Sequence, residues 1–177
     1  VWIARRIQAA PLPRTSRIAR PEIWAAGVGL LAGVAVFSGN LVNYPLERAG
    51  DWFTYHQDMV FFEALSSATS RFSPADSIFM SGADIRYHWL SYAWAGQVSN
   101  VAGTEPFFVL TRIVPLVALV GTVFMVVAWA SRLSTVPWVP TLAVLLVVTG
   151  GYVGGLYGVI LNFDSPSQAM TTMWLVA

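Results

Sequence analysis

The sequence contains no cysteine and no lysine, and it has few charges of any kind: 11% of its 177 residues are charged. A soluble domain usually carries about 25% charged residues. The absence of cysteine excludes disulfides, thiol catalysis and cysteine metal sites. The low charge disfavours a water-soluble enzyme, a secreted disulfide scaffold and a disordered protein. The net charge of +1 gives no reason to expect nucleic acid as a partner.

Three long stretches carry no charge at all, namely residues 23–46, 113–131 and 133–163. A helix of about 20 residues crosses the roughly 30 Å hydrocarbon core of a bilayer. We therefore predict an all-α polytopic membrane helix bundle over residues 22–177, with spans at about 23–42, 106–131 and 138–161. A fourth span is expected to start near Gln168. The sequence stops at Ala177 inside an uncharged run, so we expect it to be the N-terminal part of a longer protein.

Residues 1–21 hold five arginines and no acid, and three prolines interrupt any long helix there. Cytoplasmic loops of membrane proteins are enriched in basic residues. We therefore interpret this segment as a cytoplasmic linker and the chain as a multi-pass plasma-membrane protein. A signal peptide is the alternative, but the apolar core is longer than usual and Phe37-Ser38-Gly39-Asn40 is not a typical cleavage site.

Residues 43–105 form the predicted first outer loop, and they differ from the rest of the chain. They contain seven of the nine acids and both histidines, together with many aromatic residues. The pattern predicts two helices, at about 51–69 and 87–101, separated by a turn-rich stretch. Both are aromatic and amphipathic without being basic, which is typical of helices that lie along the membrane interface.

The first of these helices offers candidate catalytic groups. Helical spacing places Asp51, Tyr55 and Asp58 on one face, with His56 on the neighbouring stripe. A carboxylate at the membrane surface acts as a general base when burial or a like charge raises its pKa. We assign Asp58, Asp51 and His56 as candidate catalytic residues and Tyr55 as a candidate substrate contact. A helix-capping role for Asp51 and a packing role for His56 are the structural alternatives.

Candidate substrate-binding residues lie at the start of the second outer helix and of the second span. Arg86 would either pair with Asp84 or hold a phosphate, and Tyr87 and His88 follow it directly. Arg112 lies in the first turns of the second span, where its side chain can reach the headgroups. Two histidines and a carboxylate are a workable donor set for a divalent metal. However, no tight metal-ligand spacing is present, so no metal site is assigned.

The order of these parts resembles the GT-C superfamily of membrane glycosyltransferases. The residues that carry the resemblance are DWFTYHQD at 51–58 and YHWLSY at 87–92, which look like large bacterial membrane proteins of this type. The resemblance implies a polyprenyl-phosphate-linked sugar as donor and a glycan or lipid as acceptor. It also implies that an early outer acid, here Asp51 or Asp58, is the base, with Arg86 or Arg112 neutralising the phosphate. The Asp-x-Asp pair common in the superfamily is replaced by His56-Gln57-Asp58.

Two other classes of function remain open from the residues alone. A transporter would need polar groups along a path through the spans, and the three predicted spans offer few. A non-catalytic assembly module would use small residues for close helix contacts. The glycines of the third span are the support for that use. The Gly29-x-x-x-Gly33 pattern of the first span would also let helices approach closely, and it equally fits ordinary span composition.

Overall fold

The computed structural model describes residues 20–46, 57–71, 89–150, 169–170 and 173, and all regular structure within them is helical. The elements are α2 (Arg20–Asn43), α3 (Gln57–Arg71), α4 (Leu90–Ala102), α5 (Pro106–Phe108), the π-helical segment η2 (Val109–Ile113), α6 (Val114–Leu133) and α7 (Val139–Thr149). The predicted all-α class is confirmed for these residues.

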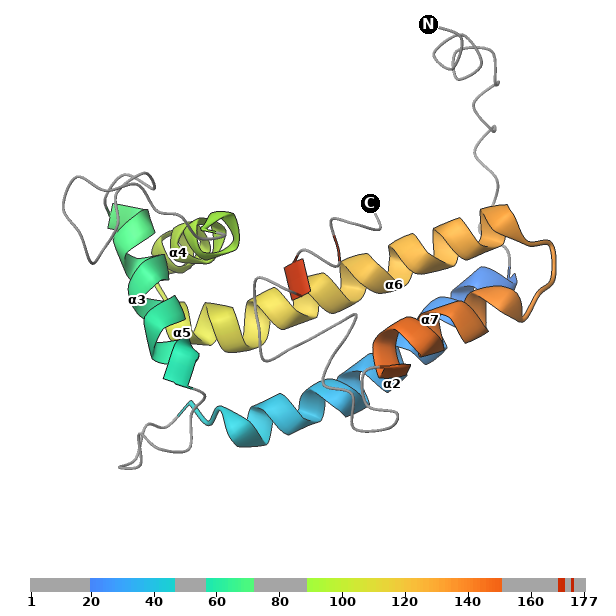
Figure 1. The fold of residues 1–177 in the computed structure, drawn as a ribbon, viewed down its shortest axis with the longest axis horizontal. Coiled ribbons are helices and arrows are strands. Elements are labelled where there is room, and N and C mark those ends of the chain that lie inside the picture. Colours follow the sequence, from blue (N-terminus) through green and yellow to red (C-terminus); the bar gives the residue numbers. More distant parts are fainter. Residues whose placement is uncertain (1–19, 47–56, 72–88, 151–168, 171–172, 174–177) are drawn as a thin grey trace, which may run out of the picture.

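Three long elements lie side by side and alternate in direction (Figure 1). α2 runs toward the end of the molecule that holds α3 and α4, α6 runs back, and α7 follows the direction of α2 after a short turn. α2 approaches the other two closely because glycines face them. A Cβ atom on Gly29 would meet Val144 and Val123, and one on Gly33 would meet Leu119. The Gly29-x-x-x-Gly33 pattern is thus used for packing inside the chain.

Two segments are long and apolar enough to cross a membrane, Arg20–Gly39 and Pro106–Leu133. They coincide with the first two predicted spans. Of the third, the structure describes Trp138, α7 and Gly150, and α7 with 11 residues is shorter than a span. The remainder of that span lies outside the described residues, as do residues 1–19 of the predicted linker and all of the fourth span except Ala169, Met170 and Met173. The last two residues of the linker, Arg20 and Pro21, belong to α2 instead. A bundle of three or more spans therefore stays a prediction.

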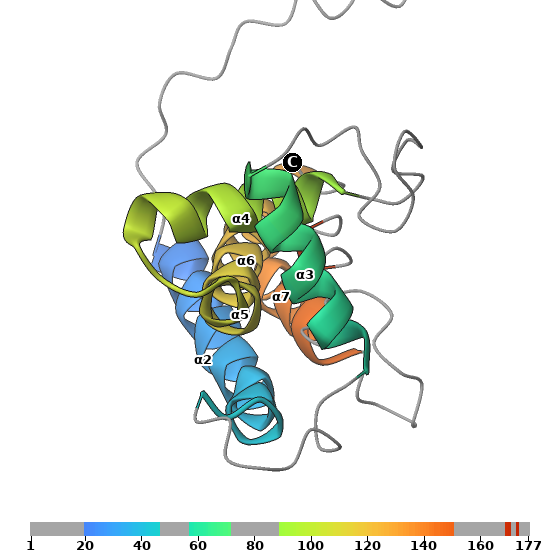
Figure 2. The same cartoon turned by 90° about the vertical axis from the view of Figure 1, so that its left-hand side faces the viewer.

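The two predicted outer helices exist and lie across one end of the long helices. α3 ends two residues beyond the predicted boundary, and α4 is described from Leu90, three residues after its predicted start. Figure 2 looks onto this pair, with α2, α6 and α7 behind it. Phe62 of α3 stacks on Tyr92 of α4 at a centroid distance of 4.8 Å, and both side chains are buried. α3 also contacts α5, and α4 contacts η2. We call α3 and α4 together the helical cap.

Candidate functional site

The second long segment changes helix type where it meets the helical cap. Pro115 has no N–H to donate to the carbonyl of Thr111 four residues earlier, and its ring crowds that carbonyl. The backbone opens by one residue here: the N–H of Val114 bonds the carbonyl of Val109, which is π-helical spacing. The hydroxyl of Thr111 donates to the carbonyl of Phe107 at 2.7 Å. Such π-bulges occur frequently at functional sites.

Arg112 lies in this π-helical segment and bridges two carbonyl oxygens. One guanidinium nitrogen donates to the carbonyl of Thr111 at 3.1 Å. Because Pro115 cannot donate an N–H to this carbonyl, the arginine supplies a charged donor in its place. The other donates at 2.5 Å to the carbonyl of Tyr44, which lies just past the end of α2. The arginine therefore ties the end of the first long helix to the start of the second, across 68 positions of sequence.

Arg112 keeps most of its charge uncompensated within the described part of the chain. The guanidinium has five N–H donors, its two hydrogen bonds go to neutral oxygens, and it makes no ion pair with any described residue. The residue is half-buried. A partly desolvated guanidinium with spare donors is well suited to bind a phosphate or carboxylate.

The helical cap brings Asp58 to the same end of the molecule. Asp58 lies in the first turn of α3, where its carboxylate is exposed and the helix dipole favours a negative charge. Its neighbour Met59 is buried at 1% exposure and anchors that turn in the core. Asp58 is thus held on a packed helix with an exposed side chain, and it also makes an interaction within the protein.

The described residues include two of the eight predicted site residues, Asp58 and Arg112. The other six lie outside them, so their placement stays a prediction; they are Asp51, Tyr55, His56, Arg86, Tyr87 and His88. Among the described residues no group of three potential metal ligands comes together.

Sequence reasoning missed two contributors to this site. The backbone carbonyl of Tyr44 has no sequence signal, because every residue offers the same oxygen. The π-bulge does have a sequence signal, which is Pro115 inside an otherwise helical run, because a proline there leaves the carbonyl of Thr111 without its helical donor. Glu105, exposed directly before Pro106, adds a further carboxylate at this end.

Comparisons with protein-family models, with curated proteins and with solved structures find no match for this chain.

Proposed function

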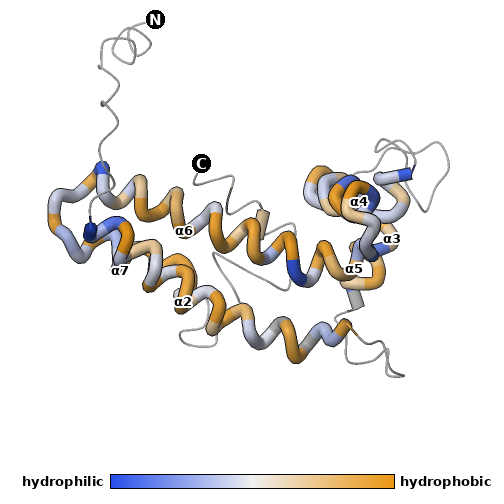
Figure 3. Tube along the Cα trace, turned by 180° about the vertical axis from the view of Figure 1, so that it is seen from behind, coloured by the Kyte–Doolittle hydropathy of each residue, from blue (hydrophilic) through white to orange (hydrophobic). Residues whose placement is uncertain are grey.

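We propose that this chain is a membrane protein whose helical cap lies on the outer face of the membrane. The support is the surface of its long helices. Fewer than half of the residues in each span-length window are buried, although both windows are strongly apolar. Figure 3 shows hydrophobic residues along α2, α6 and α7, with hydrophilic ones mainly at the ends of these helices and on the helical cap. Lipid is the environment that removes such a surface from water.

We further propose a glycosyltransferase of the GT-C type, which transfers a sugar from a polyprenyl-phosphate donor to an acceptor glycan or lipid on the outer face. The observation that carries this proposal is the half-buried, acid-free guanidinium of Arg112 beneath a helical cap that bears Asp58. The donor phosphate would bind the spare guanidinium donors, and its lipid tail would run beside the long helices. Asp58, or Asp51, would accept the proton of the acceptor hydroxyl as the hydroxyl oxygen attacks the anomeric carbon of the sugar. The bond from that carbon to the phosphate oxygen would break, and the polyprenyl phosphate would leave with its charge held by Arg112.

The test is sugar transfer from a radiolabelled polyprenyl-phosphate donor in membranes that contain the full-length protein. Loss of a general base usually lowers turnover by about 10²- to 10⁴-fold, so we expect such a loss for Asp58→Asn or Asp51→Asn. Arg112→Gln should mainly raise the KM for the donor. Glu63→Gln removes another carboxylate from α3 and serves as the matched control. Unchanged turnover in both aspartate variants would remove the proposed base.

Transport is a second candidate, because one observation favours it. Thr122 lies near the middle of the Pro106–Leu133 segment, and its buried hydroxyl has no hydrogen-bond partner among the described residues. Polar groups at the centre of membrane helices often mark a substrate path. Uptake of a solute into vesicles, abolished by Thr122→Val, would favour transport over transfer.

A further inference from the structure

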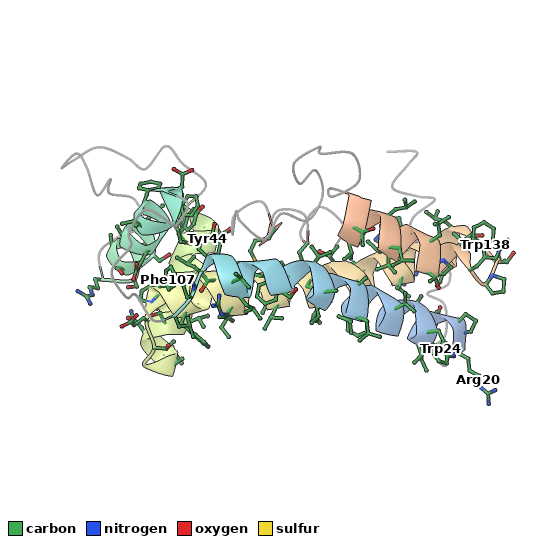
Figure 4. All side chains as sticks on the ribbon, turned by 90° about the horizontal axis from the view of Figure 1, so that it is seen from below. Arg20, Trp24, Tyr44, Phe107 and Trp138 are labelled. Atoms are coloured by element: carbon green, nitrogen blue, oxygen red, sulfur yellow. The ribbon has the colours of Figure 1, made fainter. Side chains whose placement is uncertain are left out.

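The end of the molecule opposite the helical cap carries three exposed tryptophans. Trp24 of α2 is 73% exposed, Trp129 of α6 is 53% exposed and Trp138, just before α7, is 62% exposed. Figure 4 shows Trp24, Trp138 and Arg20 at one end of the long helices, and Tyr44 and Phe107 at the other. Large exposed indoles on three elements are not explained by packing within the described chain.

Each of the two antiparallel helices places an arginine just outside its tryptophan. In α2, Arg20 precedes Trp24 by four residues, and in α6, Arg132 follows Trp129 by three. Both spacings put the two side chains on one helix face. Because the helices run in opposite directions, both arginines are displaced from the tryptophans toward the same end of the molecule.

Within the described part of the chain, the arginines at this end have no side-chain partner. Arg20 and Arg132 are exposed, and neither makes a side-chain interaction with another described residue. The structure describes one acidic residue at this end, Glu22 in the first turn of α2. Its side chain is half-buried and interacts within the protein. Residues 1–19 of the sequence, which lead into α2, add four arginines and no acid.

The depth of the tryptophans matches a bilayer. Trp24 and Asn43, the last residue of α2, are 19 positions apart, which corresponds to about 28 Å of helix. This is about the thickness of the hydrocarbon core. An interfacial indole with a guanidinium about one turn farther out is the arrangement that reaches the phosphates of lipid headgroups.

We propose that Arg20, Trp24, Trp129, Arg132 and Trp138 form a headgroup-binding ring that selects anionic phospholipids. The indoles lie among the headgroups and upper acyl chains, and the two guanidinium groups bind lipid phosphates. The inference rests on the proposed membrane placement of α2 and α6 and is independent of the proposed transferase activity. The ring fixes the depth of the helices, and with it the height of Arg112 and the helical cap at the opposite interface.

The test uses the absence of cysteine. A fluorophore attached at Thr135→Cys, an exposed position between Arg132 and Trp138, reports on lipids at the ring. The chain is reconstituted into phosphatidylcholine vesicles, and brominated phosphatidylglycerol or brominated phosphatidylcholine is titrated in as a quencher. We expect the phosphatidylglycerol to quench at lower mole fraction. A basic residue near an anionic surface contributes about a fivefold gain in affinity, so Arg20→Gln and Arg132→Gln should each weaken this preference about fivefold.

Arg71→Gln is the matched control, because Arg71 is an exposed arginine on the helical cap. It should leave the preference at Thr135→Cys unchanged. Equal quenching by the two lipids in the wild-type ring, or an equal loss in Arg71→Gln, would overturn the ring. Resistance of each variant to alkaline extraction separates the two proposals: a chain that alkali removes from the vesicles overturns the membrane placement and the ring together, whereas an inserted chain without lipid preference overturns the ring alone.

Discussion

At the scale of single residues, Gly96 sets how closely the two helices of the cap pack. A Cβ atom at this position would overlap the backbone oxygen of Ser66 and crowd the side chain of Ser70. Backbone cannot move aside as a flexible side chain can, so we expect Gly96→Ala to lower the free energy of unfolding by about 1–3 kcal/mol. Thermal unfolding in detergent measures this. Gly27→Ala, a helical glycine with open space around it, is the control, and an equal loss there would contradict the packing argument.

Thr122 gives the opposite expectation. Its hydroxyl is buried and unpaired within the described structure, and a buried polar group without a partner costs about 1–3 kcal/mol. Thr122→Val keeps the branched shape and removes the hydroxyl. We expect it to stabilise the protein by about 1 kcal/mol in the same unfolding measurement. A destabilised variant would show that the hydroxyl has a partner.

At the scale of elements, Arg112 and Pro115 form one structural unit, and their effects should be coupled. Arg112→Gln removes charged hydrogen bonds to the carbonyls of Thr111 and Tyr44, which should cost about 1.5–3 kcal/mol. Pro115→Ala supplies an N–H that reaches the Thr111 carbonyl in an α-helix. In that background Arg112→Gln should cost about 1 kcal/mol less, as read from a double-mutant cycle of unfolding free energies. Additive losses would mean that the arginine and the proline act independently.

The existence of the elements could be predicted from the sequence, but the contacts between them could not. The uncharged stretches locate α2 and the Pro106–Leu133 segment to within a few residues, because length and hydropathy are local properties. The hydrogen bond from Arg112 to the Tyr44 carbonyl depends on how two helices pack against each other, and the spacing of residues in the sequence does not predict that packing. The same holds for Gly96, which is not part of a small-xxx-small pattern. Its role comes from the close approach of the Ser66 backbone in α3.

At the scale of the whole molecule, the candidate site was predicted only in outline. Charge segregation indicated that the acids of residues 43–105 belong to one side. The structure places α3, which carries Asp58, and η2, which carries Arg112, at one end of the long helices, where both contact α4. The sequence reasoning placed Arg112 within reach of the headgroups and of a donor phosphate, and it did not anticipate the hydrogen bonds that the structure shows to two protein carbonyls. Hydropathy describes a side chain's preference for lipid or water. It carries no information about backbone hydrogen bonding, so it could not show that Pro115 leaves the carbonyl of Thr111 without a donor.

The orientation of the whole molecule in the membrane can be read from its two ends. Gln97 of α4 and Thr135 of the α6–α7 turn are both exposed, and they belong to opposite ends of the long helices. Since the chain has no cysteine, Gln97→Cys and Thr135→Cys each introduce a single labelling site. The excess of arginine beside α2 favours the cytoplasm for the end that holds Thr135. A membrane-impermeant maleimide should therefore label Gln97→Cys in intact cells, and label Thr135→Cys only after permeabilisation. Labelling of both positions from one side would show that α6 does not cross the bilayer, and the reversed pattern would place Asp58 in the cytosol, away from any acceptor on the outer face.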